Sequence, residues 1–162
     1  KARWFNQQYM QSKDNVELTD LYIPILKEKG VSRDQEYVLK VVSSIKERAV
    51  FVTDFWELSS FFFEAPIEFD VKASKKNWKE GTSELMTAVA LFISNIEDFS
   101  SENTEKEIKE WITNKEIGFG KVMQPLRLSL VGKLAGPHLF DIIAMIGKQE
   151  TVKRIENAIN KL

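Results

Sequence analysis

The stretch from Gly118 to Lys148 reads GFGKVMQPLRLSLVGKLAGPHLFDIIAMIGK. Its apolar residues predict one helix around Leu126 and a second helix from Leu139 to Ile146. Gly132 and Gly147 stand where these helices should end, since glycine readily takes the left-handed conformation of a helix C-terminus. Gly136-Pro137 is expected to open the second helix, because proline is favoured in a first helical turn. This stretch therefore predicts an all-α fold.

The rest of the chain repeats the helical spacing. Stripes of apolar residues predict further helices at Leu18-Leu21-Tyr22-Ile25-Leu26, Val38-Val41-Val42-Ile45, Leu85-Val89-Phe92-Ile93-Ile96, Ile108-Trp111-Ile112, and Val152 to Leu162. Pro24 is expected to kink or split the first of these helices. No alternating pattern typical of strands competes with this interpretation.

Several polar residues are predicted to cap these helices. Ser32 with Gln35, and Thr104 with Glu107, have the spacing of a capping box, in which a hydroxyl and a glutamate or glutamine side chain exchange bonds with backbone N–H groups. Thr53 is expected to cap a short helix through Trp56 and Glu57, by accepting a backbone N–H.

Between Ile67 and Lys79 the apolar spacing is lost and lysines gather. This is the best internal boundary in the chain. We therefore expect two consecutive helical bundles, an N-terminal one over residues 1–75 and a C-terminal one over residues 76–162. Two interpretations of Lys72, Lys75, Lys76 and Lys79 stay open, a solvated linker or a set of contacts to a polyanion.

Composition narrows the function. The 162 residues have a formal net charge of −1, with 16 Lys and Arg against 21 Asp and Glu up to Ile117 and 7 against 3 after it, so a basic end follows an acidic body. Such a distribution can steer a polyanion to one face. The chain lacks cysteine, a signal peptide and a long apolar run. We expect a cytoplasmic protein without disulfides or a membrane span, and a fragment of a longer chain, because it begins without methionine.

No pattern for catalysis is present. His138 is the only histidine, which excludes a two-histidine metal site, and the glycine motifs of phosphate and dinucleotide sites are absent. A nucleophilic serine motif is also missing. We therefore expect no catalytic residues and no metal ligands in this chain.

Arg127 is the leading candidate for ligand binding. It follows Pro125 and lies between Leu126 and Leu128 on a helix that must be partly buried. A guanidinium group can stack on a nucleobase and donate forked hydrogen bonds to a base edge or phosphate. The alternative is a surface arginine that pairs with Asp141 or another carboxylate.

The second candidate is the segment that begins at Gly136-Pro137. Glycine permits the close approach of a base or another backbone, although an ordinary helix start would have the same sequence. Leu139 is either an apolar platform for a base or a core residue. His138 either contacts a phosphate or has no role.

These motifs resemble the C-terminal anticodon-binding region of bacterial glutamyl-tRNA synthetases. The resemblance rests on Gln124 to Arg127, on Gly136 to Phe140, and on Ile146-Gly147-Lys148. It extends to Trp4-Phe5-Asn6-Gln7-Gln8-Tyr9 near the start of the chain and to the segment from Lys46-Glu47-Arg48 through Phe61-Phe62-Phe63. It thus covers nearly the whole sequence.

The resemblance implies an all-α fold of the class I aminoacyl-tRNA synthetase anticodon-binding type. It places Arg127, Gly136, Pro137 and Leu139 against anticodon bases, and it makes further residues, Arg48, Lys133 and His138, contacts to the tRNA backbone. In some relatives an anticodon-reading arginine stands at the position of Val50, so that contact is absent here or supplied differently.

The resemblance also implies the partner. The protein would be a monomer that binds a glutamate tRNA, tRNA(Glu). It would bind neither DNA nor a membrane. The full-length enzyme would use ATP with magnesium to activate glutamate, whereas this chain lacks the ATP-binding motifs and is expected to bind no cofactor. The competing hypothesis is a non-catalytic helical adaptor that holds a protein partner in an apolar groove.

Overall fold

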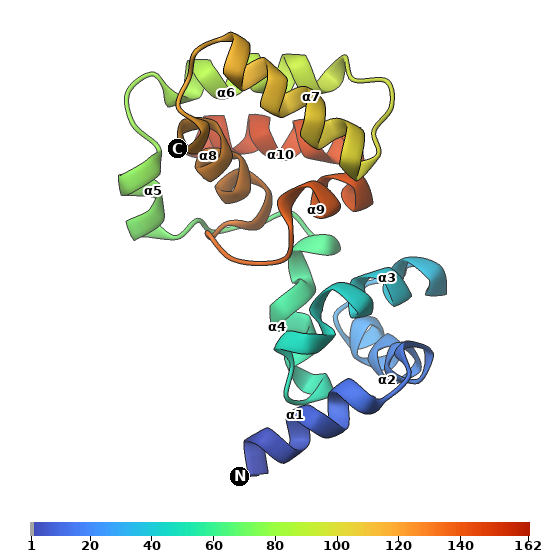
Figure 1. Ribbon diagram of the computed structural model, residues 1–162. Helices are drawn as coiled ribbons and strands as arrows, with labels where there is room; N and C mark the ends of the chain where they lie inside the picture. Colours follow the sequence, from blue (N-terminus) through green and yellow to red (C-terminus); the bar gives the residue numbers. More distant parts are fainter. Residues whose placement is uncertain (1) are drawn as a thin grey trace. The chain divides into compact units, whose positions relative to one another are not determined.

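The computed structural model describes residues 2–162, and within that range the side chains of residues 2–5 and 7 are left aside. Every regular element in this range is helical, so the predicted all-α class is confirmed (Figure 1). The chain forms two compact units, the first ending at Glu64 and the second running from Ala65 to Leu162. The predicted division into two functional parts, residues 1–75 and residues 76–162, stays a prediction.

In the described part of the first unit there are four α-helices, α1 (Ala2–Ser12), α2 (Asn15–Glu28), α3 (Gln35–Ile45) and α4 (Phe55–Ser59), and three short 3₁₀ helices, Lys46–Arg48, Val52–Asp54 and Ser60–Phe62. The stripe predicted on α3 is fully buried. On α2 the buried face is narrower than predicted, because Leu21 is 46% exposed while Leu18, Tyr22 and Leu26 are buried. The core of this unit is thus apolar and aromatic.

Pro24 does not split α2, and a kink there stays a prediction. The helix runs unbroken from Asn15 to Glu28 with Pro24 inside it. Pro24 is exposed, so the carbonyl group of Asp20, which loses its usual N–H partner, lies on the solvent side, where water can replace that bond.

The predicted caps are also corrected. The side chain of Asp34, not Ser32, caps α3 by accepting a hydrogen bond of 2.8 Å from the N–H of Tyr37. Thr53 lies inside a 3₁₀ helix, and α7 (Ser101–Asn114) begins before Thr104, with Ser100 as its cap. Asp34 and Ser100, two and four residues from the predicted caps, thus cap α3 and α7, whereas no side chain caps α4. Thr104 is buried in the core instead.

Tyr22 predicts a pH dependence of stability. Its side chain is fully buried and its hydroxyl lies 2.7 Å from Ser59 Oγ. Burial raises the pKa of Tyr22 to about 12 from an ordinary value of 10.0. The folded state holds this proton more tightly, so the stabilisation is complete below pH 10 and is lost as the pH rises toward 12. We expect a loss of about 2–3 kcal/mol over that range, and alkaline unfolding of Tyr22→Phe should show a shallower fall in stability than the parent chain.

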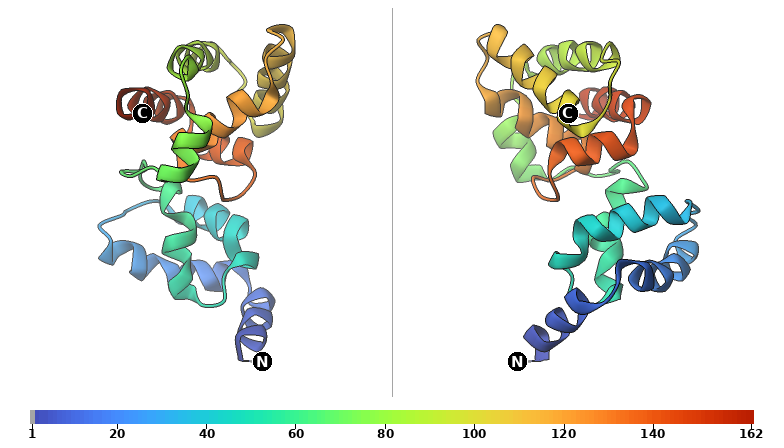
Figure 2. Two further views of the ribbon diagram at one scale, coloured as in Figure 1. Left: turned by 90° about the vertical axis from the view of Figure 1, so that its left-hand side faces the viewer. Right: turned by 45° about the vertical axis from the view of Figure 1, so that its right-hand side comes forward.

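The second unit contains α5 (Val71–Asn77), α6 (Thr82–Ser94), α7, α8 (Phe119–Val131), α9 (Leu139–Ile146) and α10 (Lys148–Lys161). Helices α6 and α10 pack side by side, and α8 packs against both (Figures 1 and 2). The predicted stripe on α6 is buried at Val89, Ile93 and Ile96, whereas Phe92 is half-buried against Trp111. The helices predicted for the Gly118–Lys148 stretch and for the end of the chain are confirmed.

The lysine-rich segment from Ile67 to Lys79 contains a regular helix. Helix α5 forms within it, because the side chain of Asp70 accepts a hydrogen bond of 2.9 Å from the N–H of Ala73 and starts the helix. The apolar periodicity missed α5, since none of its residues is fully buried.

Candidate functional site

Helix α8 positions Arg127. Leu126, Leu128 and Leu130 are fully buried around it, while Arg127 itself is half-buried. Pro125 is buried inside the helix, so the backbone ahead of Arg127 is held both by packing and by the proline ring. The direction in which the arginine leaves the helix is therefore fixed by the core.

The loop that follows α8, residues 132–138, begins under a tight constraint. Gly132 has a φ of +86°, and a β-carbon added there would lie 2.8 Å from both the carbonyl oxygen of Glu68 and Cβ of Pro66. The Gly132 carbonyl also accepts a hydrogen bond of 2.8 Å from the N–H of Asp70. The prediction that a left-handed glycine ends α8 is confirmed, and the close approach ties this loop to the segment before α5.

Arg127 and the Gly136-Pro137 segment, separated in sequence, are brought together. Arg127 Nη1 donates a hydrogen bond of 3.1 Å to the carbonyl oxygen of Ala135, the residue before Gly136. Gly136 is half-buried with a positive φ, and Pro137 is buried. A guanidinium group is thus held by its edge beside a rigid turn.

Helix α9 has the predicted range, Leu139–Ile146, but Gly136-Pro137 does not open it. Its N-cap is His138 and its first residue is Leu139, so Pro137 precedes the helix instead of lying in its first turn. The Leu139 side chain is only 3% exposed, which favours the core interpretation for that side chain. Its backbone N–H, in contrast, is in the first turn of a helix, where no carbonyl of the same helix can accept it.

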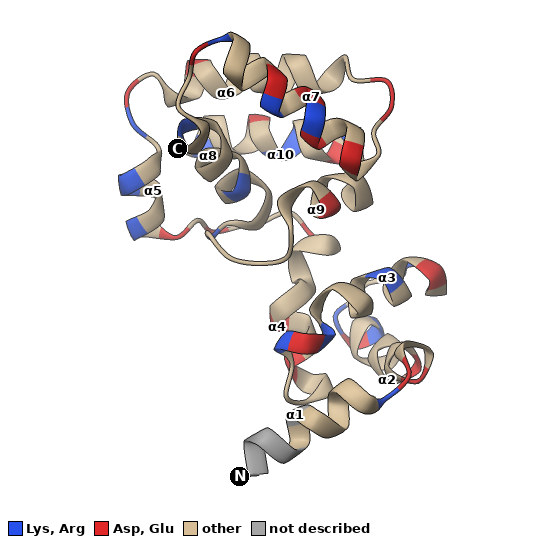
Figure 3. Cartoon of the chain, in the orientation of Figure 1, with Lys and Arg blue, Asp and Glu red and all other residues tan. Residues whose placement is uncertain are grey.

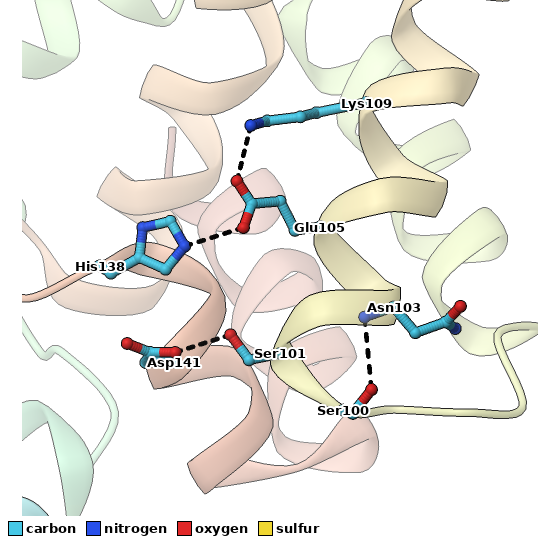
Figure 4. A network of polar contacts seen from close by, with 7 residues as sticks. All are labelled: Ser100, Ser101, Asn103, Glu105, Lys109, His138 and Asp141. Atoms are coloured by element: carbon cyan, nitrogen blue, oxygen red, sulfur yellow. Dashed lines mark hydrogen bonds and ion pairs between the residues drawn. The ribbon is translucent and has the colours of Figure 1, made fainter.

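His138 is exposed and belongs to a polar network between α7 and α9 (Figure 4). His138 Nε2 lies 3.0 Å from Glu105 Oε1, and the other oxygen of Glu105 is 2.6 Å from Lys109 Nζ. Hydrogen bonds from Lys109 and His138 hold the pKa of Glu105 below its ordinary value. In the same region Ser101 Oγ donates to Asp141 Oδ1 over 2.6 Å, so two contacts fix the start of α9 on α7.

The remaining predicted residues lie in different places. Lys133 is exposed in the loop after Gly132, in the second unit. Arg48 is exposed at the end of the 3₁₀ helix Lys46–Arg48 in the first unit. Val50, where some members of the resembling family have arginine, is 5% exposed and belongs to the core of that unit. Part of the Trp4–Tyr9 motif falls on side chains outside the described ones.

Sequence reasoning missed one residue that shapes this region, Arg154 on α10. Its guanidinium group is only 2% exposed, and Nη1 donates 2.9 Å to the carbonyl oxygen of Leu130 near the end of α8. The one available signal was Glu150, four residues earlier on the same helix face, whose Oε2 accepts from Arg154 Nε over 2.7 Å.

Within residues 2–162, no group of three or more His, Cys, Asp or Glu has an arrangement that could hold a metal ion. None of the helices described is long and apolar enough to cross a membrane.

An arginine held beside a rigid turn, next to an exposed histidine and lysine in an all-helical unit, is an arrangement suited to single-stranded RNA loops. The fold and this arrangement define an all-helical module with a positioned cation at a turn. A family model described as "Anticodon binding domain" matches residues 17–159. The chain belongs to the anticodon-binding domain family, and the fold expected from the resemblance is confirmed.

Similar proteins agree with this assignment. The chain is 55% identical over 162 residues to the glutamate–tRNA ligase of Flavobacterium psychrophilum and 46% identical to that of Bacteroides thetaiotaomicron, covering all of this chain and 32% of each relative. A crystal structure of a glutamate tRNA ligase from Elizabethkingia meningosepticum, in complex with its amino acid, superposes with a TM-score of 0.93 at 45% identity, over 99% of this chain and 32% of that one. The chain thus spans about a third of the length of these ligases.

Proposed function

We propose that this chain recognises the anticodon loop of tRNA(Glu) within a longer glutamate–tRNA ligase. The observation that carries the proposal is the hydrogen bond from Arg127 to Ala135, which fixes a planar cation beside the Gly136-Pro137 turn. Family membership and the identity to glutamate–tRNA ligases support the choice of partner. The longer enzyme would attach glutamate to this tRNA with ATP and magnesium, in the cytoplasm, and the chain is expected to act as a monomer.

The edge of the Arg127 guanidinium group is oriented by Ala135, so its plane can serve as a stacking surface for an unstacked base. The burial of Leu126 and Leu128 anchors the backbone from which Arg127 projects. Binding would then cost little side-chain entropy, because the arginine is already ordered in the free protein.

The roles proposed for the neighbouring residues follow from their exposure. Because the side chain of Leu139 is buried, its contact to a base would be made by the backbone N–H, with Pro137 and Gly136 shaping the approach. Lys133 and His138 are exposed and would contact phosphates, as would Arg48 from the first unit. His138 would do so from beside Glu105, whose Oε1 lies 3.0 Å from its Nε2.

Replacing Arg127 tests this proposal. We expect Arg127→Ala to weaken binding of an RNA hairpin with the anticodon stem and loop of tRNA(Glu) by about 1–3 kcal/mol, because one base loses its stacking partner. Arg127→Lys should lose most of the same energy, since an ammonium group keeps the charge and not the plane. Fluorescence anisotropy with the labelled hairpin measures both.

The control is Lys153→Ala, which removes an exposed cation from α10 of the same unit. It should leave the affinity nearly unchanged. Equal affinities for Arg127→Ala and the parent chain would remove Arg127 from the site. Absence of hairpin binding at low salt would favour the protein-adaptor hypothesis, whose apolar contacts should respond little to salt.

A further inference from the structure

A groove of the second unit lies outside the site described above. It is a cavity of about 550 Å³ between the end of α5, the start of α6 and the start of α8. Seven of the eleven residues that line it have polar or charged side chains, although apolar atoms make up most of the lining surface. The residues that the argument uses are Lys76, Lys79, Glu80, Lys121 and Gln124.

The charge of this groove suits an anion. Three lysines and one carboxylate line it, and Lys76, Lys79 and Lys121 are all exposed. Figure 3 shows Lys and Arg residues, in blue, on the short helix α5. The second unit as a whole has 14 Lys and Arg against 14 Asp and Glu, so the excess of positive charge is local to the groove.

Helix α8 connects the groove with Arg127. Lys121, Gln124 and Arg127 are spaced three residues apart on α8, so each is a surface neighbour of the next, and the row winds by about 120° around the helix from Lys121 to Arg127. At 1.5 Å per residue, Lys121 and Arg127 are separated by about 9 Å along the axis. A strand whose base lies on Arg127 can therefore place a neighbouring phosphate at the groove.

We propose that this groove binds the phosphodiester backbone of the RNA strand next to the base held by Arg127. Lys76, Lys79 and Lys121 supply the charge, and Gln124 supplies an amide N–H donor between them and the arginine. This inference rests on the proposed function and deepens it, by assigning a positioning role to lysines that read no base.

The test compares two triple variants of equal charge. One replaces the groove lysines (Lys76→Gln, Lys79→Gln and Lys121→Gln), and the control replaces exposed lysines elsewhere in the same unit (Lys106→Gln, Lys153→Gln and Lys161→Gln). The probes are the tRNA(Glu) hairpin and a hairpin with an unrelated anticodon, each titrated across a salt series. Thermal unfolding of both variants checks the fold.

We expect the groove variant to bind both hairpins about tenfold more weakly, with a slope of log affinity against log salt that is shallower by about two. The control variant should keep the parent slope. A variant with arginine at all three groove positions should restore it, because it restores the charge.

Other outcomes overturn the inference. Equal losses in the groove and control variants would mean that general electrostatics alone is at work. Inorganic phosphate that, at constant ionic strength, removes the difference between parent and groove variant would identify a site for a small anion. If Arg127→Ala weakens binding while the groove variant does not, the groove fails and the proposed function stands. If the parent chain binds neither hairpin, both fail together.

Discussion

Replacing Gly132 with alanine is expected to lower the free energy of unfolding by about 3–4 kcal/mol. Two costs add at this position. A residue with a β-carbon pays about 1–2 kcal/mol for the left-handed conformation, and here φ is +86°. The new β-carbon would also meet the Glu68 carbonyl oxygen and the Pro66 ring at 2.8 Å, distances that force the backbone to move.

Gly81 provides a matched control. Its φ is +88°, and a β-carbon added there has no atom within 4 Å. Gly81→Ala should therefore pay only for the conformation, about 1–2 kcal/mol. Chemical denaturation of both variants measures the two losses. Equal losses would show that the close approach at Gly132 relaxes without cost.

The Gly132 variant should also affect the Arg127 site. The Asp70 N–H bonds the Gly132 carbonyl, and any backbone shift there moves the start of the loop whose Ala135 carbonyl holds Arg127. We expect weaker hairpin binding by Gly132→Ala even under conditions in which the variant is fully folded, and no such change for Gly30→Ala, which alters a glycine of the first unit with a φ of +75° and no atom within 4 Å of an added β-carbon.

The sequence predicted the fold where helices bury one face. The stripe on α3 illustrates this, since its 3.6-residue spacing reports burial directly. The leucines around Arg127 stand two residues apart and are all buried because α8 is covered on several sides. It failed for α5, which buries no residue fully and is fixed by the cap at Asp70. Helix starts were also misplaced, because several serines, threonines and aspartates near each start are chemically able to cap.

The candidate site was predicted in part. Local sequence pointed to Arg127 and to the Gly136-Pro137 turn, and the resemblance linked them to one ligand. The hydrogen bond to Ala135 depends on the path of the loop, which local patterns do not determine. The sequence showed Lys76 and Lys79 as part of a charged segment. It did not show that they line one groove with Lys121, because that depends on the packing of α5 on α8.

Arg154 is the position where sequence reasoning and structure differ most. It lies in the polar sequence KQETVKRIENAINK, in which an arginine is expected on the surface, yet it is buried. Its Nη1 donates to Leu130, whose carbonyl is among the last four of α8 and has no N–H partner within its own helix. Helix α10 thus caps the end of the helix that carries Arg127.

Replacing Arg154 with alanine is expected to cost about 3 kcal/mol of stability. The loss combines a charge-assisted hydrogen bond to a buried carbonyl, an ion pair to Glu150 and a cavity at the interface of α8 and α10. Lys153→Ala, at the exposed neighbouring position, should change stability by no more than about 0.5 kcal/mol.

Two further variants divide the loss between its causes. Glu150→Gln removes only the ion pair with a partly exposed carboxylate and should cost about 1 kcal/mol or less. Arg154→Lys keeps a charge but shortens the side chain and loses the fork, so the bond to Leu130 should be weakened and most of the alanine loss retained. If Arg154→Ala cost no more than Glu150→Gln, water would be replacing the guanidinium group at the end of α8, and Arg154 would not hold that helix in place.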